Sequence, residues 1–323
     1  MAVVIPCYRV RETVLAVVRA VPPAVAAIYV VDDCCPEGSG RLVHEGVGDP
    51  RVRVLFNERN LGVGGATLAG FRRALEEGAD VIVKIDGDGQ MDPALLPHFV
   101  APIAAGHADY TKGNRFFNLE DVAAMPRARL AGNAVLSFVA KLSGGYWNIF
   151  DPTNGYVAIH ARVFAWLPAG KIDPGYFFET DMLFRLNTLR AVVADIPMRA
   201  VYGGAASSLR LPREAVRFAA GHARNFARRI FYNYFLRDFN FASLELVLGS
   251  LLVLFGGVFG AMKWWQGSVH DVFASSGTVM LSALPVILGA MLLLAFIGHD
   301  IQSVPRDPIH GRLPRGPARH RAG

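Results

Sequence analysis

A strand-like segment that leads directly into closely spaced acidic residues limits most strongly how this chain can fold. Residues 81–85 favour a strand buried in a parallel sheet, and Asp86-Gly87-Asp88-Gly89-Gln90 follows at once. The carboxyl ends of such strands form the edge where open α/β sheets bind ligands. Asp86, Asp88 and Gln90 offer the oxygen ligands that Mg²⁺ or Mn²⁺ prefers when the ion also holds a diphosphate. The alternative is an ordinary surface turn, because Asp-Gly is a common turn pair.

Residues 1–112 alternate between strand-like and helix-like segments, which indicates an α/β domain with a mainly parallel, Rossmann-like sheet. The expected strands are Val3–Ile5, Ala27–Val31, Val52–Phe56, Val81–Ile85 and Asp109–Thr111. Amphipathic helices are expected near residues 10–20, 39–46, 64–77 and 93–105. Residues 113–212 are less regular and rich in Gly, Pro and aromatic residues, which is typical of a substrate-contacting region.

The C-terminal part of the 323-residue chain contains two apolar segments, Leu244–Met262 and Val279–Ile297, each near the length of about 20 residues that spans a bilayer. Arginines precede the first segment and follow the second, whereas the loop between them carries Lys263 beside Trp264-Trp265. The positive-inside rule therefore predicts a hairpin with both termini in the cytoplasm. We expect an integral protein of the cell inner membrane. The alternative is a buried helix pair in a soluble protein.

An arginine-rich segment, residues 212–238, lies before the first apolar segment. Its arginines alternate with Phe, Ile and Tyr at helical spacing, so we expect an interfacial helix that holds Arg224, Arg228 and Arg229 against anionic headgroups. The net charge of +6 raises a nucleic-acid-binding patch as the alternative. The segment leads straight into an apolar helix, however, and we expect no nucleic-acid partner.

These features divide the chain into four parts. They are an α/β domain (1–211), an interfacial helix (212–240), two transmembrane helices (241–300) and a basic cytoplasmic tail (301–323). The three cysteines form no CxxC pair, which argues against a disulfide framework or a zinc site.

Three further clusters lie where strands are expected to end. Tyr8 could border a nucleobase, and Asp33 could accept hydrogen bonds from a base or ribose. Residues 60–66 (Asn-Leu-Gly-Val-Gly-Gly-Ala) open a helix, so their backbone amides could face an anion, although no Walker A lysine follows. Each cluster could also be structural, as loop residues in the first two cases and as close helix–sheet packing in the third.

In this order the motifs resemble those of glycosyltransferase family 2 enzymes with a GT-A fold. The branch they resemble contains the dolichol-phosphate mannose synthases and the bacterial polyprenyl-phosphate hexose transferases, whose bacterial members have a similar two-helix anchor. The resemblance spans nearly the whole part before the apolar segments. It is carried by Val4–Tyr8, Val31–Ser39, Asn60–Gly62, Asp86–Pro93, Gly113–Arg115, Asp151–Tyr156 and Phe178–Asp181.

The resemblance implies roles for individual residues. Asp86, Asp88 and Gln90 match the motif that holds the metal, Mg²⁺ or Mn²⁺, and through it the donor diphosphate. Asp181 is the candidate base or orienting carboxylate and Asp88 the second catalytic candidate, with helix capping as the alternative for the acidic residues near 181. The residues implied to surround the nucleotide sugar are Pro6, Tyr8, Val31, Asp33, Asp86, Gly87 and Asp88. Those implied to bind the acceptor and its phosphate are Arg115, Arg127 or Arg129, Asp151 and Asn154.

The sequence departs from the family at two places. The first motif usually continues to an acidic residue that touches the base, whereas Arg9 follows Tyr8 here. The branch often carries a lysine in a Lys-Ser-Ser-Leu run, whereas residues 204–209 read Gly-Ala-Ala-Ser-Ser-Leu, so Arg199 or Arg210 would have to replace that cation. These changes bear on the identity of the donor.

We therefore expect a metal-dependent, inverting hexosyltransferase. Its donor would be GDP-mannose or a UDP-hexose, and its acceptor a polyisoprenyl phosphate at the cytoplasmic face of the membrane. Membrane lipid is an expected partner, and the sequence leaves open whether the protein forms a homo-oligomer. One alternative is a family 2 enzyme that acts on a lipid-linked saccharide or a polysaccharide. The other is a catalytically silent membrane protein that binds nucleotide sugars, against which the intact acidic motif argues.

Overall fold

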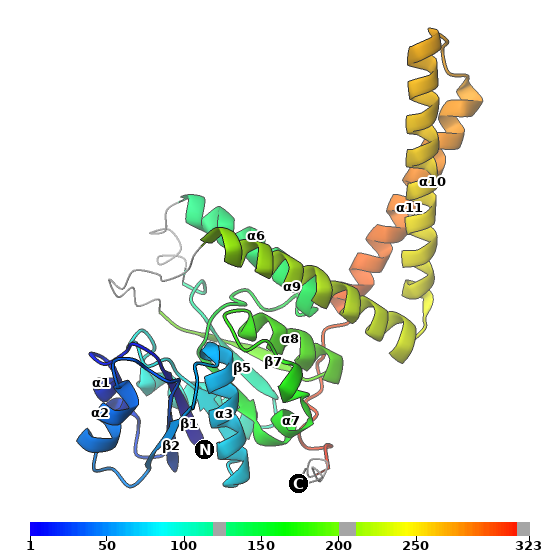
Figure 1. Cartoon of the computed structure of the whole chain (residues 1–323). Helices are drawn as coiled ribbons and strands as arrows, with labels where there is room; N and C mark the ends of the chain where they lie inside the picture. The colour runs from blue at the N-terminus through cyan, green and yellow to red at the C-terminus, as the bar shows by residue number, and fades with distance from the viewer. Residues whose placement is uncertain (119–126, 200–210, 315–323) are drawn as a thin grey trace. The chain divides into compact units, whose positions relative to one another are not determined.

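The computed structural model describes residues 1–118, 127–199 and 211–314, except for the side chains of residues 127–129 and 211–214 (Figure 1). The chain forms two compact units. The first contains Met1–Phe226 and the residues from Val304 on, and the second is Ala227–Ser303. Residues 211–226, most of the arginine-rich helix, belong to the first unit in this division.

The first unit is built on a seven-stranded sheet with the order β3-β2-β1-β4-β6-β5-β7. β6 is antiparallel to both of its neighbours, and the other adjacent pairs are parallel. The residues just before β6 therefore lie at the same edge of the sheet as the residues just after β4 and β5. The strands are β1 (Ala2–Cys7), β2 (Ala27–Asp32), β3 (Val52–Phe56), β4 (Val81–Lys84), β5 (Tyr110–Asn114), β6 (Val157–His160) and β7 (Val193–Pro197).

Alternating side chains of β1 and β2 point to opposite faces of this sheet. Val4 and Val31 enter one apolar core, which α3, α7 and α8 cover, whereas Val3 and Val30 enter a second core, which α1, α2 and α4 cover. The sheet is thus the middle of three layers, as expected for a doubly wound α/β domain (Figure 1). The helices are α1 (Val14–Ala20), α2 (Ser39–Gly46), α3 (Gly62–Glu76), η1 (Pro93–Leu95), α4 (Leu96–Ala104), α6 (Arg127–Gly144), α7 (Ala161–Trp166), η2 (Ala169–Lys171) and α8 (Phe178–Leu189).

The strands and helices expected in residues 1–112 are present, with bounds that differ by a few residues. The segment 113–212, expected to be less regular, contains β6, β7 and four helices, α6, η2, α7 and α8, among its described residues before α9. β6 has only four residues, and β7 carries Asp195 at its centre. Neither strand shows the apolar run or the strict alternation that identifies a strand from sequence.

Two long helices, α10 (Phe241–His270) and α11 (Ser276–Gln302), form most of the second unit and contain the two predicted apolar segments. Both are long and apolar enough to cross a membrane. Only 11% of the most apolar window of each helix is buried, so a buried pair in a soluble protein is not what the structure describes. The helices approach closely at glycines: a Cβ on Gly249 would lie 3.0 Å from the carbonyl oxygen of Gly289.

The arginine-rich helix α9 (Leu211–Phe231) continues as the π-helix η3 (Tyr232–Arg237). Arg224 and Arg228 are exposed, but Arg229 is only 1% exposed and does not face headgroups as we expected. Its guanidinium binds the two carboxylate oxygens of Asp300 at 2.6 and 3.0 Å, and the Tyr234 hydroxyl donates to the same carboxylate. The charge pattern alone could not identify this distant partner.

Residues that follow α11 complete the first unit. Both carboxylate oxygens of the fully buried Asp109 accept hydrogen bonds from the backbone N–H of Ile309, at 2.9 and 3.0 Å. The apolar side chains of Val304, Ile309 and Leu313 pack against the core that α3 covers. The segment expected to be a basic tail thus contributes ordered residues to the first unit.

Candidate active site

The acidic turn follows β4 at the carboxyl edge of the sheet. Asp88 is exposed, and Asp86 and Gln90 are half-buried. Oδ1 of Asp88 accepts a hydrogen bond from the backbone N–H of Gln90 at 3.0 Å, which fixes the turn. Desolvation raises the pKa of Asp88, and the negative charge of Asp86 raises it further.

The donor set of this turn fits a hard divalent cation. Two carboxylates and the carbonyl oxygen of one carboxamide supply the oxygen ligands that Mg²⁺ and Mn²⁺ prefer. Within the described part of the chain, no group of three or more His, Cys, Asp or Glu side chains could hold a metal ion. An ion at this turn would therefore need Gln90 or substrate oxygens beside Asp86 and Asp88.

Lys84, the last residue of β4, places a buried ammonium group beside the acidic turn. Its side chain is 1% exposed, and Nζ lies 2.8 Å from Oδ1 of Asp86 and 3.3 Å from Oε1 of Glu179 in the first turn of α8. Desolvation opposes the charged form, but the two carboxylates outweigh it and raise the pKa of Lys84 above its ordinary value. Lys84 is therefore charged near neutral pH and joins Asp86 to Glu179.

Gly155 brings the turn before β6 against this ion pair. A Cβ on Gly155 would lie 2.5 Å from Nζ of Lys84 and 2.8 Å from Oδ2 of Asp86. From the side of β1, the Thr13 hydroxyl donates a hydrogen bond of 2.6 Å to the carbonyl oxygen of Gly87. The acidic turn is thus held between the segment after β1 and the turn before β6.

The residues predicted to surround a nucleotide differ in exposure. Tyr8 is 43% exposed, whereas Pro6 and Val31 are buried within their strands. Arg9 has a φ of 57°, in the left-handed region that non-glycine residues rarely adopt, and its guanidinium carbon lies 5.5 Å from the centroid of the Tyr8 ring. An exposed tyrosine–arginine pair therefore stands where the family motif has an acidic residue.

Asp33 is 2% exposed and organises the neighbouring loops. Its carboxylate accepts three hydrogen bonds of 2.8 Å, from the backbone N–H groups of Leu61 and Gly62 and from the side-chain amide of Asn57. These bonds occupy both carboxylate oxygens and tie the end of β2 to the start of α3.

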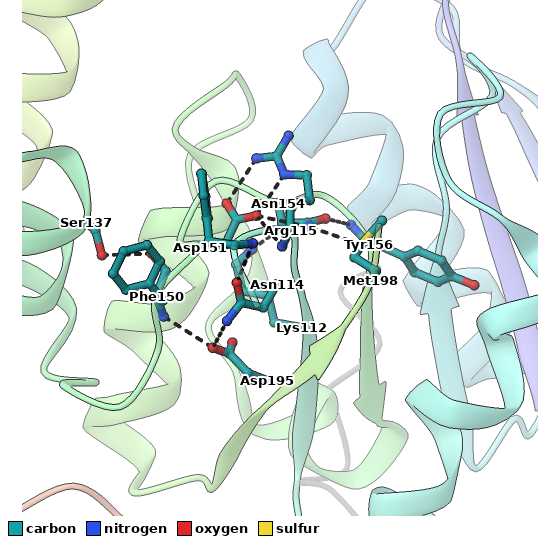
Figure 2. A network of polar contacts seen from close by, with 11 residues as sticks. Lys112, Asn114, Arg115, Ser137, Phe150, Asp151, Asn154, Tyr156, Asp195 and Met198 are labelled. Carbon is teal, nitrogen blue, oxygen red and sulfur yellow. Dashed lines mark hydrogen bonds and ion pairs between the residues drawn. The ribbon is translucent and has the colours of Figure 1, made fainter. Parts of the chain in front are cut away.

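Arg115 and Asp151, predicted on the acceptor side, form a bidentate ion pair (Figure 2). Nε of Arg115 lies 2.8 Å from Oδ2 of Asp151, and Nη2 lies 3.0 Å from Oδ1. The Asp151 side chain is 1% exposed, whereas that of Arg115 is 33% exposed. The buried carboxylate therefore holds a partly exposed guanidinium in a fixed orientation.

Asn154 extends this network toward β5 and β6 (Figure 2). Its Nδ2 donates to Oδ2 of Asp151 at 3.3 Å, and its Oδ1 accepts from the backbone N–H of Tyr156 at 2.9 Å. Its backbone carbonyl accepts a hydrogen bond from the ammonium group of Lys112, which is fully buried in β5. Burial lowers the pKa of Lys112 to about 8. Three of the residues predicted on the acceptor side are thus brought together.

Asp195 in β7 belongs to the same network. Its Oδ2 accepts hydrogen bonds from Nδ2 of Asn114 at 3.0 Å and from the backbone N–H of Phe150 at 3.3 Å. Its Oδ1 is buried and has no hydrogen-bond partner among the described residues. Desolvation raises the pKa of Asp195 to about 6.

Asp181, the candidate base, is fully buried in α8. Its Oδ2 accepts from the backbone N–H of Asp173 at 3.0 Å and from Nε of Arg185 at 2.9 Å, and its Oδ1 accepts from Nδ2 of Asn225 at 3.0 Å. Two of these hydrogen bonds tie α8 to the segment before it and to α9, and the one from Arg185 lies within α8. In the same helix turn, Glu179 is the carboxylate that reaches Lys84 and, through it, the acidic turn.

Some predicted residues lie outside what the structure describes. Arg127 and Arg129 belong to the first turn of α6, but their side chains are outside the described part. Residues 204–209 and Arg210 are also outside it, whereas Arg199 is described and exposed.

Lys84, Lys112 and Asp195 escaped the sequence analysis. A signal for Lys84 was present, because a lysine inside the otherwise apolar strand Val-Ile-Val-Lys must find a buried partner. Lys112 and Asp195 offered no comparable signal, since their strands are not strongly apolar in sequence.

Comparison with known proteins agrees with this architecture. A sequence model described as glycosyl transferase family 2 matches residues 2–166. The undecaprenyl-phosphate mannosyltransferase of Micrococcus luteus is 32% identical over 199 residues, which cover 60% of this chain and 81% of that protein. The polyprenol monophosphomannose synthase of Mycolicibacterium smegmatis is 32% identical over 201 residues, which cover 61% of this chain and 75% of that protein.

Solved structures extend the likeness to the fold. Glucosyl-3-phosphoglycerate synthase from Mycobacterium tuberculosis, crystallised with Mn²⁺, UDP-glucose and phosphoglyceric acid, matches with a TM-score of 0.51 and 19% identity. The match covers 71% of this chain and 78% of that chain. At this identity the likeness concerns the fold alone, and it confirms the expected GT-A fold.

Proposed function

Because the chain belongs to glycosyl transferase family 2 and is a glycosyltransferase, we propose that it transfers a hexose from a nucleotide diphosphate sugar to a polyisoprenyl phosphate. The observation that carries the proposal is the contact of Gly155 with Lys84 and Asp86, which joins the acidic turn to the turn that holds Asp151 and Asn154. A donor held at the first turn would thus lie next to an acceptor held at the second. The names of the two mannosyl-transferring relatives support mannose as the sugar, so of the two expected donors we propose GDP-mannose.

Asp86, Asp88 and Gln90 would hold Mg²⁺ or Mn²⁺ on the donor side. The ion would supply positive charge to the nucleoside diphosphate as it leaves. Tyr8 and Arg9 would border the base, while Asp33 keeps the loops after β2 and β3 in place.

Arg115 would orient the acceptor phosphate. Its guanidinium is planar, partly exposed and already fixed by Asp151, which suits an anionic oxygen-rich ligand. A phosphate oxygen is anionic at neutral pH, so attack on the sugar from the face opposite the leaving group needs no strong general base. Asp181 would therefore act by positioning α8, because its three hydrogen bonds already use both of its oxygens.

The two apolar helices would anchor the enzyme with its catalytic unit and both termini in the cytoplasm. Arg224 and Arg228, which are exposed, would interact with anionic headgroups. A reporter fused after Arg321 should then be cytoplasmic, and one inserted between Gln266 and Ser276 should be external. Two cytoplasmic readings would contradict this topology.

The function is tested with the purified full chain, a panel of nucleotide sugars and undecaprenyl phosphate. The expected product is a polyprenyl-phosphate hexose, formed fastest from GDP-mannose in the presence of Mg²⁺ or Mn²⁺. Transfer only to a lipid-linked saccharide would support the alternative acceptor. Donor binding without any transfer would support a silent binding protein, and either result would overturn the proposal.

A further inference from the structure

We propose that Lys84 and Glu179 set how strongly the acidic turn holds a divalent cation, with Lys84 as a buried counter-ion shared between Asp86 and Glu179. The inference rests on the proposed function, because it concerns the cation assigned to Asp86, Asp88 and Gln90. It adds two positioning residues that act on the cation through Asp86.

Lys84 cannot serve the substrate directly. Its side chain is 1% exposed, and its ammonium group lies 2.8 Å from Asp86 and 3.3 Å from Glu179. The Asp86 oxygen nearest to its ammonium group is Oδ1, while Oδ2 of the same carboxylate lies on the side of Gly155, where an added Cβ would be 2.8 Å from it. The ion pair therefore holds the Asp86 carboxylate in a fixed orientation at the acidic turn.

The charges of these side chains are close enough to act on a cation. Lys84 carries one positive charge, and Asp86, Asp88 and Glu179 carry three negative charges, so the group has the net charge that one divalent cation neutralises. Lys84 and Glu179 are buried, and charges interact more strongly there than in water. Removal of Lys84 would make the site more attractive to a cation, and removal of the Glu179 charge would make it less attractive.

Glu179 has a second effect on the same carboxylate. It competes with Asp86 for the ammonium group and so limits how tightly Lys84 binds Asp86. Without this competition Lys84 would pair with Asp86 alone and oppose an incoming cation more strongly. Both effects predict that Lys84→Met and Glu179→Gln change the affinity for the cation in opposite directions.

The test measures the affinity for Mn²⁺ alone, with no nucleotide, from the electron paramagnetic resonance signal of free Mn²⁺. It compares the wild-type full chain with Lys84→Met, Glu179→Gln and the double variant, whose net charge at the site equals that of the wild type. We expect Lys84→Met to lower the Kd for Mn²⁺ by about tenfold and Glu179→Gln to raise it by about tenfold. The double variant should return to within about threefold of the wild type.

Two controls separate charge from folding. Lys171→Met removes an exposed lysine of η2 and should leave the Kd for Mn²⁺ unchanged. Thermal unfolding is measured for every variant, because Lys84→Met leaves two carboxylates without their counter-ion. If Lys84→Met does not fold, Glu179→Gln and the double variant still carry the test, since the double variant must bind Mn²⁺ more tightly than Glu179→Gln.

The outcomes distinguish this inference from the proposed function. The counter-ion role alone would be overturned if the wild-type protein binds Mn²⁺ and both folded variants, Lys84→Met and Glu179→Gln, have the wild-type Kd. It would also be overturned if both variants shift the Kd in the same direction. Wild-type protein that binds no Mn²⁺ would overturn the metal site and this inference together. Hexose transfer is measured separately, so the reaction itself can be established or refuted independently.

Discussion

A methyl group on Gly155 would lie 2.5 Å from Nζ of Lys84, so these two residues can meet only because position 155 has no side chain. The contact depends on the antiparallel direction of β6, which brings the turn before that strand to the edge where β4 ends. It joins the two halves of the candidate site, which are the acidic turn and the network around Asp151. Figure 2 shows the second of these halves.

Gly155→Ala tests this contact without a change in charge. The atoms that the new methyl group would displace are the ends of flexible side chains, Nζ of Lys84 and Oδ2 of Asp86, and Gly155 does not have a positive φ. We expect the kcat of transfer to fall by at least about tenfold, which corresponds to about 1.4 kcal/mol in the barrier. Tm is measured beside it, because displacement of a buried ion pair also lowers stability. Gly170→Ala, where nothing lies within 4 Å of the added Cβ, is the matched control. A Gly155→Ala enzyme with wild-type kinetics would mean that the contact has no role in the reaction.

Arg115→Lys tests the acceptor side. Lysine keeps the positive charge but cannot make the two parallel bonds that Arg115 makes to Asp151. We expect the KM for the polyprenyl phosphate to rise by about tenfold while the KM for the nucleotide sugar stays unchanged. Separate titrations of the two substrates measure this, and an equal rise for both would argue against a role at the acceptor phosphate.

Asp181→Asn separates a structural carboxylate from a general base. The amide would replace one acceptor oxygen with a donor and leave the buried Arg185 without its ion pair. Breaking a buried pair in this way costs about 3 kcal/mol or more, so Tm should fall clearly. We expect the pH profile of the remaining activity to keep its shape. A normal Tm with kcat reduced by orders of magnitude would instead identify Asp181 as the base.

The local parts of this site were predictable from sequence, and its long-range contacts were not. The apolar residues before Asp86 predict both the strand and the place where it ends, because the signal is contiguous. Lys84, Gly155 and Glu179 are separated by many residues, and nothing in their local sequence indicates that they meet. Asp181 and Glu179 illustrate the same limit: they lie two residues apart, and only the fold decides which of them faces Lys84.

The direction of β6 had a similar effect on the prediction of the fold. A four-residue strand gives no periodic signal, so the sequence pattern could indicate a parallel sheet but not the one antiparallel strand within the described part of it. The sequence pattern wrongly predicts an exposed Arg229 for a related reason, because its partner Asp300 lies far along the chain.

Asp195→Asn gives a pH-dependent prediction. The pKa of Asp195 in the folded protein is about 6, above its ordinary value of 3.8, because the ionised form is desolvated. The stability linked to the protonated carboxyl is therefore fully present below pH 3.8 and is lost as the pH rises through about 6. Asparagine can keep an oxygen toward Asn114 and Phe150 without ionising. We expect the variant to have a higher Tm than wild type at pH 7.5 and no advantage near pH 4.

Thermal unfolding of both proteins between pH 4 and pH 8 measures this difference. The difference in Tm should grow as the pH rises through about 6. A constant difference across the range would show that the charge of Asp195 is not its cause.

The most direct test of the central claim is the rate of hexose transfer from GDP-mannose to undecaprenyl phosphate by Asp88→Asn, measured across a titration of Mn²⁺. Asp88 lies on an exposed turn, so the substitution should change the stability by less than about 0.5 kcal/mol. The account predicts that wild-type activity disappears with EDTA and returns with Mn²⁺. It also predicts that the variant keeps its Tm but loses at least about a hundredfold in kcat, a loss that corresponds to about 2.7 kcal/mol in the barrier. A variant that transfers the hexose at the wild-type rate at ordinary Mn²⁺ concentration would contradict it.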